Sequence, residues 1–291
     1  MNAMADNRCA CFLSVDLEDY KHATLLSMGL PATTNPEQTW RGTHRILSVV
    51  AKTDSHPHIT FFTTGQVARD QPDLVRELAR QGHEIACHSD QHENVYALDR
   101  VRFLQDLHRS KAVLERACGQ RVVGYRAPNF SINRDSSWAY SALIEAGFIY
   151  DSSMVTASPR AAACAYDVLE CEGHKLFEFP LYWHRMAGKL GVRVIGGTYF
   201  RLLPVSIIVA LMKAAAGQGY TPILYLHASD ADESPGAIRW NEMQGLSYLA
   251  RSQWAIRQKQ WSIRSRTTAG KLFEVLKIFP NLGRMGAVLP F

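Results

Sequence analysis

Short apolar runs alternate with helical segments along most of this chain, and this alternation limits the fold more than any other feature. The seven runs expected to form strands are residues 9–15, 59–63, 84–87, 122–125, 148–150, 177–181 and 223–226. Between them, helices are expected over residues 40–52, 72–81, 97–118, 136–146 and 204–216, and a glycine follows four of these five segments. Strands that alternate with helices predict a parallel α/β barrel or an open parallel sheet.

Several predicted strands end at, or are followed directly by, a polar side chain. These residues are Asp16, Thr63, His88, Arg126 and His227. Because the carboxyl ends of parallel strands meet at one edge of a barrel or sheet, we expect the five side chains to converge there. The sequence therefore predicts an active site on that rim.

The composition is that of an ordinary globular chain, with 47% hydrophobic and 20% charged residues among 291. No repeat or low-complexity linker divides it, so we expect one domain over residues 1–291, with residues 240–291 as a C-terminal extension packed on the barrel. The apolar runs at 10–15 and 205–217 are too short for a signal-peptide core and a membrane span, which favours a cytoplasmic protein. The six cysteines lack C-x-x-C spacing, which favours free buried thiols.

The net charge of +5 arises in the C-terminal part of the chain. From residue 240 onward, only Glu242 and Glu274 oppose eight basic residues: Arg251, Arg257, Lys259, Arg264, Arg266, Lys271, Lys277 and Arg284. No helix-turn-helix, zinc finger or aromatic RNA-binding motif accompanies them, so no nucleic-acid partner is expected. Phosphate groups or an anionic membrane surface fit this charge, and a basic face that meets only water is the alternative.

Two histidines, His88 and His92, directly follow the apolar run that ends at Cys87. Imidazoles at this spacing can close on one metal ion from a helical face or from a tight turn. A metalloprotease helix is disfavoured because Ser89 stands where such a helix needs a glutamate base. The alternative is a pair of surface histidines with no ligand.

Three carboxylates follow the first apolar run: Asp16, Glu18 and Asp19. A carboxylate at a strand end is stabilised when it binds a cation or lies in a wet cleft, and a solvated loop is the alternative. Either Glu18 or Asp19 would complete a two-histidine, one-carboxylate metal site with open coordination positions. Asp16 would then be free to act as the base on a water molecule.

Three further rim groups complete the candidate site. Pro128 restricts the backbone after Arg126, whose guanidinium is expected to keep Asp16 ionised and oriented. Asp151 and His227 follow two later strands, and a histidine there could donate the proton that amide cleavage requires. Taken alone, the arginine is also typical of a structural salt bridge, and the histidine of a satisfied polar group.

In their order and spacing, these segments resemble the five motifs of the polysaccharide deacetylases, a carbohydrate esterase family. The resemblance covers residues 9–229 and rests on Ser14-Val-Asp16, His88-Ser-Asp-Gln-His92, Arg126-Ala-Pro128, Asp151-Ser-Ser153 and Leu226-His227. It implies a distorted (β/α) barrel of about seven strands that removes an N-acyl group from an amino sugar by hydrolysis. It also implies Asp16 as catalytic base, His227 as acid, and Arg126 and Asp151 as the residues that tune them. The metal would be zinc by default, although cobalt, nickel, iron or manganese would suit the same ligands.

Within the family, Val15-Asp-Leu-Glu-Asp-Tyr20 and Gly196-Gly-Thr-Tyr-Phe-Arg-Leu-Leu203 resemble a branch encoded with bacterial exopolysaccharide or O-antigen genes. The chain departs from the family in two places. Leu17 follows Asp16 where many members have a second aspartate, which leaves Glu18 (preferred, because other members place base and ligand two residues apart) or Asp19 as the metal carboxylate. Ala228-Ser-Asp230 stands where the branch often has a proline and an aromatic residue.

The resemblance implies an N-acylated amino sugar as substrate, linked to a nucleotide or to a polyprenyl-phosphate carrier. With a membrane-bound carrier, the basic residues between 251 and 271 and the apolar end at 285–291 are expected to rest on the inner membrane. The contrary expectation is that Leu289 and Phe291 cover the barrel bottom. Two rival functions remain: hydrolysis of an N-formyl group or a cyclic amide at the same site, and a degenerate, metal-free sugar-binding protein.

Overall fold

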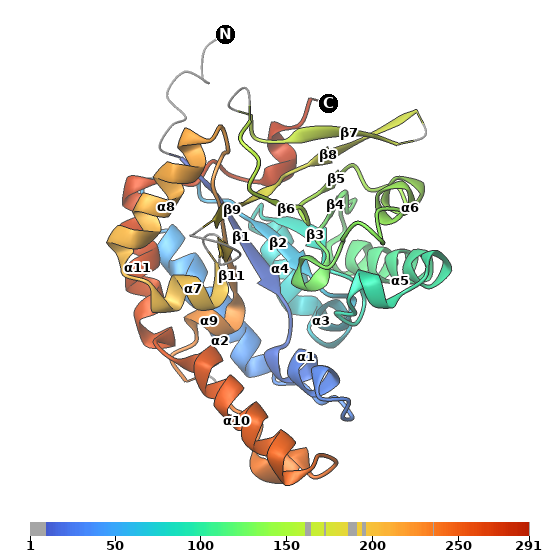
Figure 1. Cartoon of the computed structure of the whole chain (residues 1–291), viewed down its shortest axis with the longest axis vertical. Coiled ribbons are helices and arrows are strands. Elements are labelled where there is room, and N and C mark those ends of the chain that lie inside the picture. Colours follow the sequence, from blue (N-terminus) through green and yellow to red (C-terminus); the bar gives the residue numbers. More distant parts are fainter. Residues whose placement is uncertain are drawn as a thin grey trace.

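The computed structural model describes residues 10–160, 164–171, 173–185, 191–193, 196–234 and 236–290 (Figure 1). Cys9, where the first strand was expected to begin, and Phe291, the last residue of the predicted apolar end, lie outside these ranges.

A curled sheet with helices on its outer face forms the centre of the molecule. Its strand order is β11-β1-β2-β3-β4-β5-β8-β7, and every pair is parallel except β7 with β8. The strands are β1 (Phe12–Leu17), β2 (Thr60–Thr63), β3 (Glu84–Cys87), β4 (Gly124–Tyr125), β5 (Tyr150–Asp151), β7 (Asp167–Cys171), β8 (His174–Glu178) and β11 (Ile223–His227). Seven parallel strands therefore form an open half-barrel, which confirms the expected distorted barrel.

A second sheet, which the sequence did not predict, has the order β10-β9-β6. It consists of β6 (Val155–Thr156), β9 (Leu181–Arg185) and β10 (Gly191–Arg193). The run expected as one strand over residues 177–181 is wrong, because Pro180 lies between β8 and β9 and cannot donate a backbone hydrogen bond. The edge strand β7 was also missed, because its alternate residues are exposed and it has no continuous apolar run.

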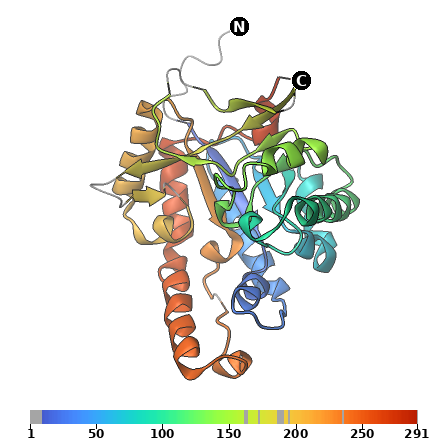
Figure 2. The same ribbon diagram turned by 45° about the vertical axis from the view of Figure 1, so that its right-hand side comes forward.

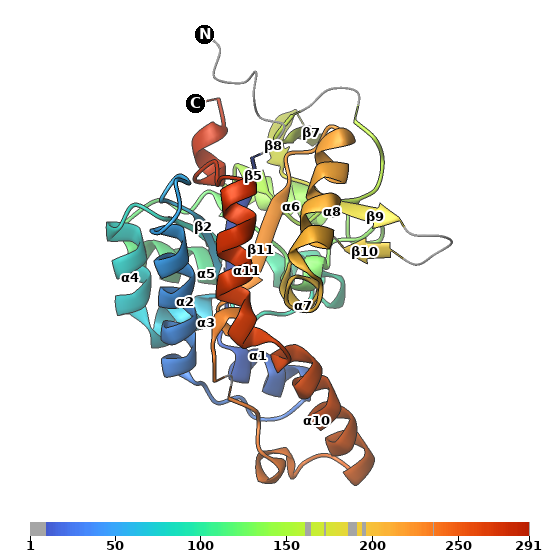
Figure 3. The same cartoon turned by 90° about the vertical axis from the view of Figure 1, so that its left-hand side faces the viewer.

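Eleven α-helices occur in the described residues: α1 (Tyr20–Ser27), α2 (Pro36–Val50), α3 (Gly65–Asp70), α4 (Pro72–Arg80), α5 (Arg100–Cys118), α6 (Ala139–Glu145), α7 (Gly197–Leu202), α8 (Val205–Gly217), α9 (Ala228–Ala231), α10 (Tyr248–Ser262) and α11 (Ser265–Ile278). Five of them, α2, α4, α5, α6 and α8, correspond to the predicted helical segments. Figure 3 shows α2, α8 and α11 in front of the sheet, with α11 between the other two. None of the described helices is both long and apolar enough to cross a membrane.

Successive side chains of each strand point to opposite faces of the sheet, so they pack into two separate apolar cores. Leu13, Val15 and Phe61 join the core between sheet and helices, whereas Phe12 and Phe62 belong to the core on the inner face. In β1, Ser14 and Asp16 share the alternation of Phe12, so both point to the inside of the half-barrel. This alternation brings Asp16 to the rim as an inward-facing carboxylate.

The end of the chain closes the half-barrel at the amino ends of its strands. Met285 is fully buried and its backbone N–H donates to the Thr60 hydroxyl (2.9 Å), while the Gly286 N–H donates to the Glu84 carboxylate (3.0 Å). Leu289 is also buried in the inner core. The expectation that this apolar end rests on a membrane is therefore wrong for Met285 and Leu289, because their side chains fill the barrel bottom. Phe291 lies outside the described residues.

The two C-terminal helices lie in different surroundings. α11 packs against α2, α8 and α9, whereas α10 contributes only Gln258 as a buried residue. Figure 2 shows α10 continuing beyond α11 and past the carboxyl edge of the sheet, on the side where α1 lies. We call α10 the arm. Its position beside the strand ends makes it part of the surroundings of the candidate site.

The cysteines carry no disulfide among the described residues. Cys11, Cys87 and Cys118 are buried free thiols, as expected, whereas Cys164 is exposed.

Candidate active site and metal centre

Glu18, His88 and His92 bring three potential ligand atoms together at the carboxyl edge of the sheet. These atoms all lie within 4.8 Å of one another. The Nδ1–H of His88 donates to the backbone carbonyl of Arg126 at 2.7 Å, which leaves its Nε2 lone pair available to a cation. The side chains of Glu18 and His92 are 12% and 13% exposed, so the site is shielded yet reachable from solvent.

The electrostatics of these three groups fit a cation. Burial lowers the pKa of His88 to about 4, so its imidazole is neutral and able to bind a metal at neutral pH. Burial alone would raise the pKa of Glu18, but the neighbouring His92, His227 and His88 outweigh burial and lower it to about 2. Two nitrogens and one carboxylate form a donor set that suits zinc and related divalent ions.

The two histidines lie in a tight turn and not on a helix. Ser89 and His92 have φ of 67° and 61°, a left-handed conformation that non-glycine residues rarely adopt. Asp106 of α5 accepts the backbone N–H of Asp90 at 3.0 Å, and the Gly65 N–H at the start of α3 donates to the Ser89 carbonyl at 3.0 Å. These contacts hold the strained turn in place, so the imidazoles are oriented by the surrounding helices.

Asp19 has a different role from its neighbour Glu18. Its carboxylate accepts the backbone N–H of His22 at 3.0 Å and that of Asn35 at 2.7 Å, which makes it the N-cap of α1. Asp19 is not among the converging ligand atoms. Of the two carboxylates that the sequence left open, the structure brings only Glu18 to the histidine pair.

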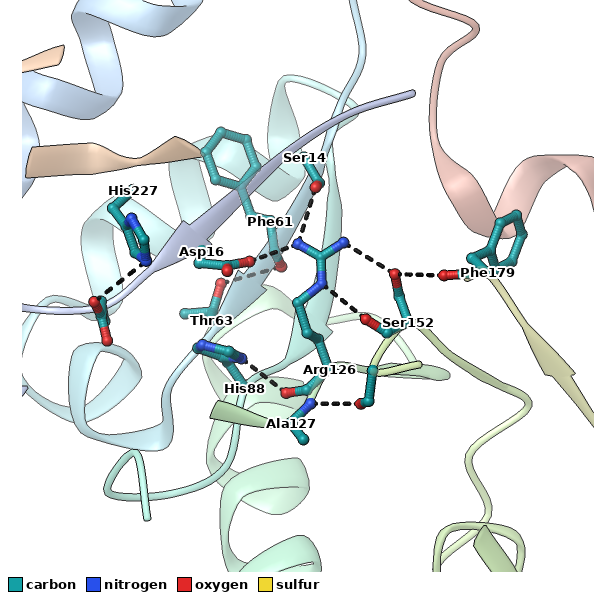
Figure 4. Close-up of polar contacts among 12 residues, drawn as sticks. Ser14, Asp16, Phe61, Thr63, His88, Arg126, Ala127, Ser152, Phe179 and His227 are labelled. Atoms are coloured by element: carbon teal, nitrogen blue, oxygen red, sulfur yellow. Dashed lines mark hydrogen bonds and ion pairs between the residues drawn. The ribbon is translucent and has the colours of Figure 1, made fainter. Parts of the chain in front are cut away.

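Arg126 holds Asp16 in place, as the sequence predicted (Figure 4). The guanidinium is fully buried and donates to the Asp16 carboxylate at 2.7 Å, to the Ser14 hydroxyl at 3.0 Å and to the Ser152 hydroxyl at 3.0 Å. It also lies 3.9 Å from the centre of the Phe62 ring. The carboxylate of Asp16 is therefore fixed beside the ligand cluster.

Among the described residues, no hydrogen bond or ion pair joins Asp151 to Asp16 or His227, and its expected tuning of them stays a prediction. Its carboxylate accepts the Ser153 hydroxyl at 2.6 Å and the Ser153 N–H at 3.1 Å. Burial raises the pKa of Asp151 and, together with the charge of Asp151, raises that of the adjacent Glu178 well above its usual range. Asp151 instead supports the turn after β5, whose Ser152 binds Arg126.

His227 is held by a residue that the sequence analysis named only as a departure from the family. Its Nδ1–H donates to Asp230 at 3.0 Å, and Asp230 also accepts the Arg201 Nε–H at 2.7 Å. Burial alone would lower the pKa of His227, but the hydrogen bond and charge of Asp230, with the charges of Glu18 and Asp16, raise it to about 10. His227 Nε2 lies 3.7 Å from Glu18.

Asp230 could have been found from the sequence, because an acid three residues after a residue that starts a helix indicates a capping box. Arg201 carries no such signal, since it lies in α7, far along the chain from His227.

A cleft opens over this cluster. Its floor contains Glu18, His92 and His227, and its walls come from three helices: Tyr20, Thr24 and Ser27 of α1, Thr198 and Arg201 of α7, and Trp261 of the arm.

Comparison with known families agrees with this geometry. The family model described as polysaccharide deacetylase matches residues 37–144, which include His88, His92 and Arg126. A second model, described as a domain of unknown function (DUF3473), matches residues 152–266, which include Arg201, His227 and the arm. Residues 37–144 therefore match the polysaccharide deacetylase family, in agreement with the resemblance found in the motifs.

Curated relatives match part of the chain. A peptidoglycan deacetylase-like protein of Gibberella zeae is 30% identical over 113 residues, 39% of this chain and 32% of that protein. A chitooligosaccharide deacetylase of Rhizobium leguminosarum bv. trifolii is 31% identical over 96 residues, 33% of this chain and 41% of that protein. The matches thus span about a third to two fifths of the length of these relatives.

Solved structures share the fold over nearly the whole chain. A Mycobacterium smegmatis protein assigned to the polysaccharide deacetylases has a TM-score of 0.58 at 21% identity, covering 97% of this chain and 95% of that one. The Puue allantoinase has a TM-score of 0.55 at 16% identity, covering 94% and 93%. Because an allantoinase shares the fold, the fold alone does not select the bond that is hydrolysed.

The geometry predicts different effects for two adjacent carboxylates. Glu18→Ala should weaken zinc binding by about 100-fold or more, because a ligand is lost and even supporting residues of metal sites contribute about 10- to 100-fold. Asp19→Ala should keep zinc affinity and lower the free energy of unfolding by about 1 kcal/mol through the lost helix cap. Calorimetric zinc titration and urea unfolding of both variants measure these effects. Retained zinc affinity in Glu18→Ala would show that the ligand set is drawn wrongly.

Proposed function

We propose that this protein removes the N-acetyl group from an amino sugar by metal-dependent hydrolysis. The observation that carries the proposal is the meeting, on one rim, of the Glu18–His88–His92 cluster with two separately held groups. Asp16 is fixed by Arg126, and His227 is fixed by Asp230. An amide hydrolase needs a base, an acid and a group that activates water, and these residues supply all three.

Glu18, His88 and His92 would hold the divalent cation, with zinc as the default and cobalt, nickel, iron or manganese as alternatives. When bound, such an ion lowers the pKa of water and polarises the acyl oxygen. Asp16 accepts a proton from the attacking water, whose oxygen forms the new bond to the acyl carbon. His227 gives its proton to the sugar nitrogen as the C–N bond breaks, so the products are acetate and a free amine.

The proposed substrate is an N-acylated amino sugar of a bacterial surface polysaccharide, of the O-antigen or exopolysaccharide type. The sugar would be linked to a nucleotide or to a polyprenyl phosphate, and the reaction would take place in the cytoplasm, where such activated sugars are assembled. The motifs that resemble the exopolysaccharide and O-antigen branch support this narrower proposal, and so does the basic C-terminal part of the chain.

The rival hydrolases differ in the bond they cleave. Release of formate, or opening of a cyclic amide without release of any acid, would favour them over N-deacetylation. A degenerate sugar-binding protein is disfavoured because base, acid and ligand cluster are each held by specific contacts. Assays of acetate and formate release from free, nucleotide-linked and lipid-linked N-acyl amino sugars discriminate among these functions.

The proposed mechanism assigns Asp16 as the base and His88 and His92 as metal ligands, so variants of these residues should have different effects. Asp16→Asn should keep its metal and lose turnover by about 10²- to 10⁴-fold, because an amide cannot accept the proton of water. His88→Ala and His92→Ala should lose both metal and turnover while they keep the fold. Metal content by plasma emission spectroscopy, circular dichroism and acetate release test all three variants. Loss of metal from Asp16→Asn would make Asp16 a ligand and refute its role as the base.

Asp230 is expected to act on catalysis through His227. Asp230→Asn should lower amide turnover by about 10- to 100-fold. Hydrolysis of p-nitrophenyl acetate should fall by less than about threefold, because its leaving group needs no proton. Asp232→Asn is the matched control, since Asp232 is also buried but binds Arg41. An equal loss on both substrates would show that Asp230 has only a structural role.

A peripheral contact with an anionic membrane is a narrower proposal, now supported by the arm and not by the chain end. Tyr248 and Leu249 at the outer end of the arm are 79% and 69% exposed. Trp240, which precedes the arm and is 42% exposed, contacts the Tyr248 ring, and Arg251 lies over the Trp240 ring. Aromatic and basic side chains are favoured at membrane surfaces.

We expect co-sedimentation with anionic liposomes at low salt, weakened at high salt. Leu249→Glu should abolish it, whereas the control Ile207→Glu, at a 46% exposed position of α8, should not. No binding at low salt, or equal effects of the two changes, would remove the membrane contact and leave the deacetylase proposal intact.

A further inference from the structure

One face of the arm carries an arginine between two indole rings. Trp254, Arg257 and Trp261 are three and four residues apart, so they share one side of α10. The Arg257 guanidinium carbon lies 5.1 Å from the centre of the Trp254 ring and 5.8 Å from that of Trp261. The two indole centres are 6.0 Å apart. The side chain of Arg257 is thus held in a defined position by stacking.

Arg257 has no carboxylate within ion-pair distance among the residues that the structure describes, and its side chain is exposed. Three other basic residues of the C-terminal part donate to backbone carbonyls of the protein itself. Arg251 donates to the Leu246 carbonyl, Arg264 to the Leu202 carbonyl, and Lys271 to the Arg201 carbonyl. Arg257 is therefore an oriented cation whose charge is available to a ligand.

This cation lies next to the cleft of the candidate active site. Trp261 lines the cleft together with Glu18, His92 and His227, and its ring meets the edge of Tyr20 with centres 6.2 Å apart. Gln253 and Gln260 flank Trp254 and Arg257 in a shallow depression on the same helix. A path of stacking and hydrogen-bonding groups therefore leads from the cleft along the arm.

The arm is joined directly to the residues that hold His227. Arg201 donates to the carbonyls of Gln260 and Ile263 at the end of α10, at 3.2 and 2.9 Å, and it also binds Asp230. Because Asp230 binds His227, the position of Trp261 is fixed relative to the reacting bond. A ligand that stacks on Trp261 would therefore be held at a fixed position relative to His227.

We propose that Trp261 and Arg257 bind the part of the substrate immediately beyond the reacting N-acyl sugar, and that this part carries an anionic group. The inference rests on the proposed function and narrows its substrate. The indole face of Trp261 suits the apolar face of a sugar ring, and the guanidinium of Arg257 suits a phosphate or a carboxylate through paired hydrogen bonds. The anion can come from a phosphate-linked carrier or from a neighbouring uronic acid, and the two sources require different probes.

The test compares three probes: neutral N-acetylglucosamine, UDP-N-acetylglucosamine, and the disaccharide of glucuronate and N-acetylglucosamine. In Arg257→Ala, the ratio of KM for an anionic probe to KM for the neutral sugar should rise about tenfold. Arg257→Lys should restore it only in part, since ammonium cannot bind in the paired geometry. Lys259→Ala is the matched control, because Lys259 is an exposed cation two residues away, on another side of the same helix.

The probe that shows the effect identifies the source: UDP-N-acetylglucosamine indicates a phosphate, and the disaccharide indicates a carboxylate. Equal ratios in Arg257→Ala and the parent protein for both anionic probes would overturn the inference, and so would an equal change in Lys259→Ala. Direct binding, measured by quenching of tryptophan fluorescence, separates this proposal from the proposed function. Arg257-dependent binding of an anionic probe without acetate release would sustain the inference and refute the deacetylase activity.

Discussion

The buried guanidinium of Arg126 is the contact on which the rest of the site depends. It binds Asp16 at the end of β1 and Ser152 after β5, while its own backbone carbonyl orients His88 after β3. A buried charge is costly unless it is paired and its hydrogen bonds are satisfied, and here the carboxylate, two hydroxyls, a carbonyl and the Phe62 ring meet that need. One residue, through its side chain and its backbone carbonyl, thus sets the relative positions of the proposed base and of one proposed metal ligand. Loss of Arg126 would leave the Asp16 carboxylate buried and unpaired.

A second buried arginine, Arg201, positions the residues around His227. Arg201 donates to Asp230, which holds His227, and it also donates to the backbone carbonyls of Gln260 and Ile263 at the end of the arm. The first arginine supports the proposed base, and the second supports the proposed acid. Arg126 holds the carboxylate of the proposed base, whereas Asp230, held by Arg201, helps to raise the pKa of the His227 imidazole to about 10.

The two parts of the chain that match family models contribute different residues to the site. The part that matches the polysaccharide deacetylase model carries the histidine turn and Arg126, and the part that matches the second model carries His227, its supporting residues and the arm. The cleft is lined by His92 and Asn129 of the first part, by α7, His227 and Trp261 of the second, and by Glu18 and α1, which precede both.

The amino-acid sequence alone was enough to predict the parallel strands and the polar residues at their ends. Each strand is visible as a short run of apolar residues, and the carboxyl ends of parallel strands always meet at one rim. The sequence could not choose between Glu18 and Asp19, which are adjacent, since the choice depends on where α1 begins and which carboxylate caps it. Nor could it show that Asp151 points to Ser153 and Glu178, that Arg201 reaches Asp230, or that Met285 fills the barrel bottom. Some of these contacts join residues that are far apart in the chain, and others depend on the direction of a single side chain. Both are determined by the packing of the whole fold, which the sequence pattern does not show.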